Sequence, residues 1–136
     1  MDPTTTRLAT AHLDSDPARF AQHIRAGRHQ LVSDEPVALG GADAGPPPYG
    51  LLLAGLGACT SITLRMYAER KGWELGPVHV DLEIVREQDA ERIERRIKLA
   101  PAITPEQRAR LAEIADKTPV TKTIKRGTPI HTTFVE

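Results

Sequence analysis

The sequence predicts an α+β fold, in which short antiparallel strands and helices occur in separate runs. Three observations carry this prediction. A long apolar helix is expected over about residues 49–71, an alternating hairpin follows within residues 78–99, and a well-capped helix begins at Thr104. Strands therefore lie before and after the long helix without regular βαβ alternation, which is typical of α+β proteins.

The first third of the chain is expected to hold small strands and then a loop. Residues 4–33 space β-branched and aromatic residues between Pro3, Pro17 and Gly27, which predicts two or three short strands. Residues 40–48 are rich in glycine and proline and predict a loop that ends where a helix begins, at or just after Pro48. At 136 residues, the whole chain (1–136) is interpreted as a single domain.

The long helix is apolar on most of its circumference. Residues at three- and four-residue steps share one face, namely Leu52, Leu56, Cys59, Thr63 and Met66. The opposite side is also apolar in the first half, so we expect the helix to be buried on most sides. Gly55 and Gly57 lower helix propensity, and we expect them to allow close approach by a neighbouring element. Gly72 is expected to end the helix.

A hairpin is expected next, because two stretches alternate apolar and charged residues. The first strand is predicted over Val78–Ile84 and the second over Ile93–Leu99, with the turn within Gln88–Glu91.

The C-terminal part begins with a helix-start signature made of Thr104 as N-cap, Pro105 at N1 and Gln107 at N3. Pro119 is expected to end the apolar face of this helix. A short helix is predicted over Val120–Arg126, and a last strand over Ile130–Val135.

Charge and composition argue against several classes of function. The 18 basic and 18 acidic residues give a formal net charge of zero, which argues against nucleic acid as a partner. No histidine pair has metal-ligand spacing and no second cysteine exists, so neither a metal nor a cofactor is expected. The start resembles no signal peptide, and the run Leu51–Cys59 is short for a bilayer span. We therefore expect a cytoplasmic protein with no membrane partner.

Cys59 is the single cysteine of the chain, and its residue type alone leaves two interpretations open. Free cysteine is often an inert, buried residue. A reactive cysteine needs a thiolate, which a nearby positive charge favours. Four arginines are candidates for that charge, namely Arg19, Arg25, Arg28 and Arg65.

The motifs around Cys59 resemble those of the OsmC/Ohr family, specifically of an OsmC-like member. The resemblance extends from about Ile24 to Val135 and is carried by the blocks Gly40–Tyr49, Leu51–Ser61, Leu64–Ala68, Glu106–Arg108 and Ile114–Val120. It implies small sheets around a long buried central helix, in an intertwined homodimer. It also implies a protein of oxidative-stress defence that reduces organic hydroperoxides.

The resemblance assigns the peroxide-attacking position to Cys59, which would become a sulfenic acid. It further implies that a second cysteine resolves the sulfenic acid and that an arginine holds the thiolate, for which Arg28 is the best match. The resolving position holds Thr118, and Tyr49 and Gly50 stand where relatives carry a glutamate. An external thiol reductant would therefore have to regenerate Cys59.

Three hypotheses remain open for the function. The first is a one-cysteine reductase of small-molecule hydroperoxides, in which Cys59 is the nucleophile. The second is a non-catalytic module with a degenerate peroxidase site that binds an apolar ligand. The third is a stress-associated scaffold whose cysteine is merely buried. A Thr118 hydroxyl within hydrogen-bond reach of the sulfur could stabilise a thiolate, which gives this residue a candidate role beside Cys59 and Arg28.

Overall fold

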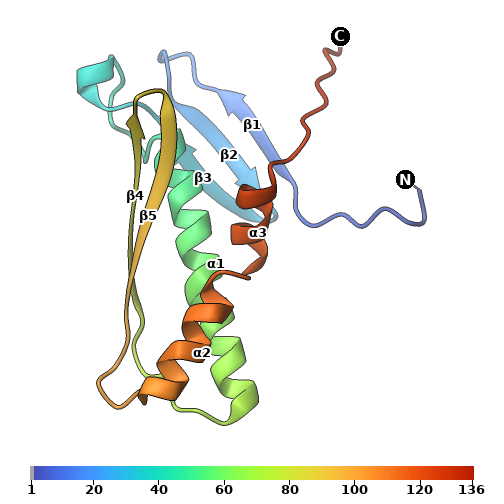
Figure 1. Cartoon of the computed structure of the whole chain (residues 1–136). Coiled ribbons are helices and arrows are strands. Elements are labelled where there is room, and N and C mark those ends of the chain that lie inside the picture. The colour runs from blue at the N-terminus through green and yellow to red at the C-terminus, as the bar shows by residue number, and fades with distance from the viewer. Residues whose placement is uncertain (1) are drawn as a thin grey trace. The chain divides into compact units, whose positions relative to one another are not determined.

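The computed structural model describes residues 2–136 and has the predicted α+β architecture (Figure 1). The elements in chain order are β1 (Ala11–Ser15), β2 (Gln22–Ala26), β3 (His29–Ser33), the 3-10 helix η1 (Val37–Leu39), α1 (Pro48–Lys71), β4 (His79–Glu87), β5 (Ala90–Lys98), α2 (Pro105–Ala115) and α3 (Pro119–Arg126). The chain divides into two compact units, Met1–Leu52 and Leu53–Glu136, and α1 runs across their boundary.

The first unit is built on an antiparallel sheet in the order β1-β2-β3. The expectation of two or three short strands is confirmed. Gly27 lies in the turn between β2 and β3 with φ of +61°, a left-handed conformation that glycine adopts without strain. Ile24 of β2 and Ser33 of β3 are the buried strand residues of this sheet.

Asp34 fixes the loop that leads from β3 to α1. Its buried carboxylate accepts backbone N–H bonds from Ala44, Ala42 and Glu35 at 3.1, 3.1 and 2.8 Å. These bonds, that of Ala44 first, hold the pKa of the carboxyl below its ordinary value, since they favour the charged form. A side chain at Gly41 would collide with the Glu35 carbonyl, so this close packing requires glycine.

The second unit packs α1 against α2 and the connections around them. Its core cluster consists of Leu64, Ala68, Leu75, Ile103, Leu111 and Ala115. The start of α2 is as predicted, because Thr104 and Gln107 form a reciprocal capping box and Pro105 occupies the first turn. Gly72 ends α1 with φ of +73°, also as predicted.

The burial of α1 corrects one expectation. The helix buries a single stripe with four-residue spacing, made of Leu56, Thr60, Leu64 and Ala68. The expected face through Leu52 and Met66 is open instead, with 42% and 58% of these two residues exposed. The reason is that the neighbours of α1 within one chain cover one side of the helix, which leaves apolar residues on its other sides, such as Ile62, exposed.

Length and composition alone would allow α1 to cross a membrane, and it is the one such helix within residues 2–136. The run Leu51–Cys59, which alone is short for a bilayer span, lies within this helix of 24 residues. About a fifth (22%) of its most apolar window is buried in its own chain. A core helix of a soluble protein has the same length and composition, so this observation is weak evidence for a membrane.

The β4–β5 hairpin is confirmed, with a two-residue turn at Gln88 and Asp89. Both residues have positive φ, as the turn type that matches strand twist requires. Leu82 on β4 pairs with Arg95 on β5, and its side chain reaches α1 at Gly57. A Cβ at Gly57 would lie 2.8 Å from Leu82 Cδ1, which confirms the predicted close approach at this glycine. At Gly55 the same prediction is wrong within the described chain, where nothing lies within 4 Å of such a Cβ.

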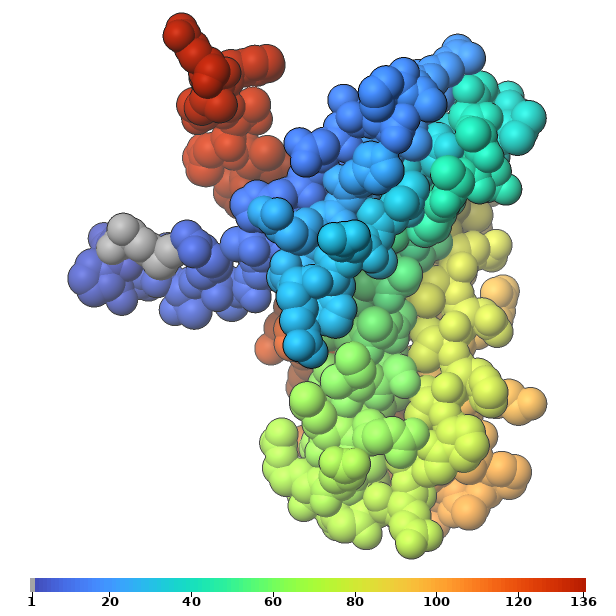
Figure 2. Space-filling model, turned by 180° about the vertical axis from the view of Figure 1, so that it is seen from behind, coloured from blue at the N-terminus to red at the C-terminus, as the bar shows by residue number. Residues whose placement is uncertain are grey.

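The predicted last strand, Ile130–Val135, is wrong. After α3 the chain runs on as an extended tail with no strand assignment, and it projects uncovered from its unit (Figure 2). Ile130 is 87% exposed and Phe134 is 96% exposed. The alternating sequence favours a strand, but a strand also needs a neighbour for its backbone hydrogen bonds, and the tail has none within its own unit.

Candidate functional site

Cys59 lies in the middle of α1, next to the buried stripe, and is half-buried. Two polar groups of the second unit face its sulfur. The backbone N–H of Val120 donates to Sγ at 3.5 Å. The hydroxyl of Thr63, one turn along α1, lies 3.8 Å from Sγ. The thiol therefore has polar neighbours and belongs to a residue that is not fully buried, unlike a cysteine that only fills a core.

The donor to the sulfur comes from the N-terminus of α3. Thr118 is the N-cap, Pro119 the first helical residue and Val120 the second. N–H groups in the first turn of a helix have no acceptor within the helix, so the Val120 N–H is free to point at Cys59. The partial positive charge of a helix N-terminus favours an anion there. A thiolate at Cys59 would gain from both effects.

Thr118 is fully buried but does not turn its hydroxyl to the sulfur. Its Oγ1 pairs with Oγ1 of Thr121 at 2.6 Å, and it makes no cap bond to its own helix. Within residues 2–136 the polar contacts of Sγ are those to Val120 and Thr63. The backbone two residues after Thr118 thus occupies the place at the sulfur that the sequence interpretation considered for the Thr118 hydroxyl.

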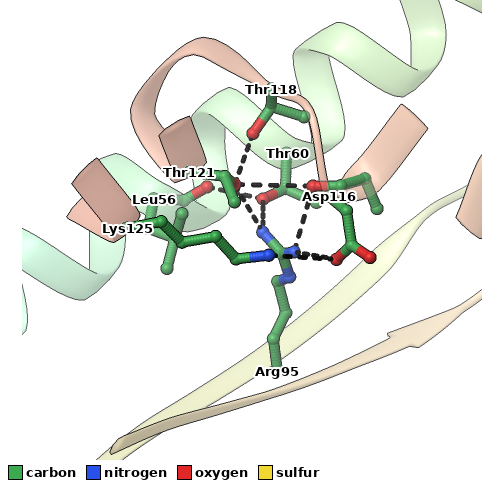
Figure 3. A network of polar contacts seen from close by, with 8 residues as sticks. Leu56, Thr60, Arg95, Asp116, Thr118, Thr121 and Lys125 are labelled. Atoms are coloured by element: carbon green, nitrogen blue, oxygen red, sulfur yellow. Dashed lines mark hydrogen bonds and ion pairs between the residues drawn. The ribbon is translucent and has the colours of Figure 1, made fainter. Parts of the chain in front are cut away.

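An arginine that the sequence interpretation missed lies beside this site. Arg95 on β5 donates from one guanidinium nitrogen, Nη1, to the hydroxyl of Thr60 at 3.0 Å and to that of Thr121 at 2.9 Å (Figure 3). These two residues directly follow Cys59 and Val120 in the sequence. A signal was present, because Arg95 is two residues from both Ile93 and Ile97 and so lies on the apolar face of its strand.

The four arginines that the sequence suggested are placed differently. Arg28 is exposed on the turn between β2 and β3, in the first unit, as are Arg19 and Arg25 elsewhere in that unit. Because Cys59 belongs to the second unit, the pairing of Arg28 with Cys59 stays a prediction. Arg65 is on α1 and donates to the Gly76 carbonyl at 2.6 Å, which is a structural contact.

The first unit has a shallow cavity of about 540 Å³ on one face of its sheet. It is lined by His12, Asp14, His23, Ile24, Arg25, Gln30, Leu31 and Val32. No group of three or more metal-binding side chains is found in residues 2–136. The cavity offers polar side chains but no thiol, so the chemistry suggested by the sequence has its place at Cys59.

Comparisons with known proteins agree with the fold. The sequence model of the family described as OsmC-like protein matches residues 40–133 of the chain. No curated protein matches it. The solved structure of an OsmC like protein from Mycoplasma pneumoniae is 19% identical with a TM-score of 0.71, and the match covers 92% of this chain and 89% of that one.

Two further solved structures are described as organic hydroperoxide resistance proteins. The one from Legionella pneumophila is 18% identical, with a TM-score of 0.67, and the match covers 89% of this chain and 91% of that one. The one from Elizabethkingia anophelis is 21% identical, with a TM-score of 0.67, and the match covers 90% and 91%. At these identities, the structural likeness establishes a shared fold.

Proposed function

The chain belongs to the OsmC-like protein family, and on this premise we propose that it is a thiol-dependent peroxidase that reduces organic hydroperoxides through Cys59. Two proteins of the same fold are named for organic hydroperoxide resistance, which supports this substrate class. The apolar surface of α1 near the thiol favours an organic peroxide over hydrogen peroxide, because an apolar group gains by leaving water.

The observation that carries the proposal is the hydrogen bond from the Val120 N–H to Cys59 Sγ at 3.5 Å. The thiolate is the nucleophilic form of cysteine, and groups that stabilise the negative charge make it available near neutral pH. A donor at the N-terminus of α3 meets this requirement. Cys59 is also not fully buried, as access of a small molecule to the thiol requires.

The reaction proceeds in balanced steps. The thiolate attacks one oxygen of the hydroperoxide, so that an S–O bond forms, the O–O bond breaks and the substrate leaves as an alcohol after taking up a proton. Cys59 is now a sulfenic acid. An external thiol then attacks the sulfur of the sulfenic acid, which releases water and forms a mixed disulfide. A second external thiol attacks the external sulfur of this mixed disulfide, which releases Cys59 as a free thiol and leaves the two external thiols joined as a disulfide. A reducing cytoplasm would supply such thiols.

Arg28 and Thr118 have distinct places in this proposal. Arg28 would place a positive charge beside the thiolate and stabilise it, as the family resemblance implies. Thr118 cannot form a disulfide, so the chain completes turnover only with an external reductant. The network that holds the Thr118 hydroxyl also keeps the N-terminus of α3 near the sulfur.

We further propose that the working form is a homodimer. The open faces of α1 carry large apolar residues, including Leu52, Ile62 and Met66. The tail exposes Ile130 and Phe134 in an extended conformation, ready to pair with a strand edge. A second copy of the chain would cover both surfaces, since apolar patches of this kind mark interaction sites.

The test of the peroxidase proposal uses cumene hydroperoxide and the full chain. We expect the protein to consume the peroxide in the presence of a thiol, and to give a dimedone adduct at Cys59 when no thiol is added. Cys59→Ser should abolish both, while Thr63→Val, which removes only the weaker contact of the sulfur, should keep most of the activity. Neither consumption nor adduct in the wild-type chain would refute the proposal.

A second candidate function is favoured by Thr118. Its hydroxyl is fully buried and pairs with Thr121, as it would if this position had adapted to packing after turnover was lost. The chain would then be a binding module for an apolar ligand. Native mass spectrometry of the purified protein should reveal a bound small molecule in that case, and catalytic peroxide consumption would reject it.

A further inference from the structure

Arg95 joins three elements of the second unit at one buried point (Figure 3). Besides its bonds to Thr60 on α1 and Thr121 on α3, its Nη2 donates to the carbonyl of Ala115 at the end of α2, at 3.0 Å. Its side chain is 14% exposed. A charged group removed from water needs such partners, so Arg95 is held in one place by the ends of two helices and the middle of a third.

The acceptors for Arg95 are themselves oriented by other bonds. The Thr60 hydroxyl donates to the Leu56 carbonyl at 2.7 Å, which leaves its lone pairs for the guanidinium. The Thr121 hydroxyl pairs with that of Thr118 at 2.6 Å. No buried side-chain nitrogen or oxygen within residues 2–136, those of this network included, lacks a hydrogen-bond partner.

Two charged groups face Arg95 from the outer side of this network. Asp116 Oδ1 lies 3.7 Å from Arg95 Nη2. The same carboxylate oxygen is 3.8 Å from Nζ of Lys125 on α3. Asp116 is 68% exposed, so this pair is screened by water and contributes little. The bonds to the hydroxyls and to the carbonyl therefore determine where the guanidinium lies.

The contact at the sulfur and the contact at Arg95 lie one residue apart on both helices. Cys59 meets Val120, and the residues that follow them, Thr60 and Thr121, meet at Arg95. The Arg95 bonds are short and charge-assisted, whereas the N–H···S bond at 3.5 Å is long. The Arg95 contacts, which are the stronger ones, therefore determine the distance between the Val120 N–H and Cys59 Sγ.

We propose that Arg95 is a positioning residue for Cys59: it ties the N-terminus of α3 to α1 through Thr60 and Thr121, and so holds the Val120 N–H on the sulfur. The role in peroxide reduction rests on the proposed function of Cys59, but the effect on the thiol does not. Arginine suits this place because the two terminal nitrogens of its planar guanidinium donate to separate elements, Nη1 to the two hydroxyls and Nη2 to the Ala115 carbonyl. The compact ammonium of lysine has no such spread of donors.

The test compares Arg95→Met and Arg95→Lys with Arg92→Met, which changes an exposed arginine of β5 that forms ion pairs with Glu87 and Glu94. The readout is the rate of Cys59 alkylation by iodoacetamide as a function of pH, with thermal unfolding measured on the same samples. We expect both Arg95 variants to raise the pH midpoint of alkylation by about one unit, equivalent to about a tenfold loss of thiolate below the midpoint. Arg92→Met should leave it unchanged.

Arg95→Lys keeps the inference testable if Arg95→Met fails to fold, because lysine keeps the charge and most of the side-chain volume. Thr121→Val gives a third route, since it removes the α3 acceptor and leaves Arg95 in place, and should shift the midpoint in the same direction. An unchanged midpoint in folded Arg95→Lys and Thr121→Val would overturn the inference. Failure of the wild-type chain to consume peroxide, with the midpoint shifted as expected, would instead reject the proposed function alone.

Discussion

Replacing Thr118 with cysteine should give the chain the second thiol that its own sequence lacks. Thr118 is fully buried and lies two residues before Val120, whose N–H reaches the sulfur of Cys59. Cysteine is close to threonine in size, so the substitution fits the site. We expect oxidation of Thr118→Cys to form a disulfide between positions 59 and 118.

The expected stability change follows from the loop length and one lost contact. A disulfide between residues 59 and 118 closes a loop of about 60 residues, for which chain entropy corresponds to about 4 kcal/mol. Loss of the hydroxyl contact between Thr118 and Thr121, at 2.6 Å, costs about 1 kcal/mol. The oxidised variant should thus exceed the wild type by about 3 kcal/mol in free energy of unfolding, and the reduced variant should be about 1 kcal/mol less stable.

The assay is urea unfolding of the oxidised and reduced variant at one protein concentration, with titration of free thiols. Cys59→Ser combined with Thr118→Cys is the matched control, because it has the new thiol but no partner for it. In hydroperoxide turnover, the variant should accept a dithiol reductant more efficiently than the wild type does. Two free thiols after full oxidation would refute the assumed proximity of these positions.

Three further predictions concern a helix contact in the second unit, a loop in the first unit and the C-terminal tail. Gly57→Ala should gain about 1 kcal/mol of stability from helix propensity but lose this gain to crowding, because the new Cβ would lie 2.8 Å from Leu82 Cδ1. In a Leu82→Ala background the crowding is absent, so urea unfolding should show the gain in free energy of unfolding. Equal effects of Gly57→Ala in both backgrounds would contradict the contact with Leu82. Because the pKa of Asp34 is lowered in the folded chain, its stabilising effect should be present above the ordinary carboxyl pKa of about 4 and be lost as pH falls below it. The difference in melting temperature between wild type and Asp34→Asn should therefore shrink in acid, and a constant difference would count against this account. Removal of residues 128–136 should weaken the proposed dimer, measured by analytical ultracentrifugation, and an unchanged dimer would show that the tail is not part of the interface.

Local signals in the sequence were sufficient for most elements. The capping box at Thr104 and Gln107 fixed the start of α2, since its two hydrogen bonds involve residues three apart. The alternation in β4 and β5 predicted the hairpin because these two strands pair with each other and are close together in the sequence. Ile130–Val135 has an equally good strand pattern and is no strand, because the hydrogen bonds of a strand come from another part of the structure that the pattern does not specify.

The candidate site was predictable only where a local motif marks a residue. The motif around Cys59 identified the candidate nucleophile, because family motifs preserve the residue that performs the chemistry. Arg95 was missed because an arginine in a strand usually faces water, and its inward orientation depends on acceptors contributed by α1, α2 and α3. The role of Val120 was not visible either, since its donor is a backbone group that every residue except proline possesses.

That last property has a genetic consequence. A donor that belongs to the main chain survives nearly every missense change at its position, so the hydrogen bond from residue 120 to Cys59 is robust to mutation in a way that a side-chain donor is not. Only proline removes this N–H, and a helix loses no internal hydrogen bond when an N–H of its first turn is removed. Val120→Pro therefore offers a rare single change that deletes one backbone donor, and a screen of side-chain substitutions would overlook residue 120 altogether.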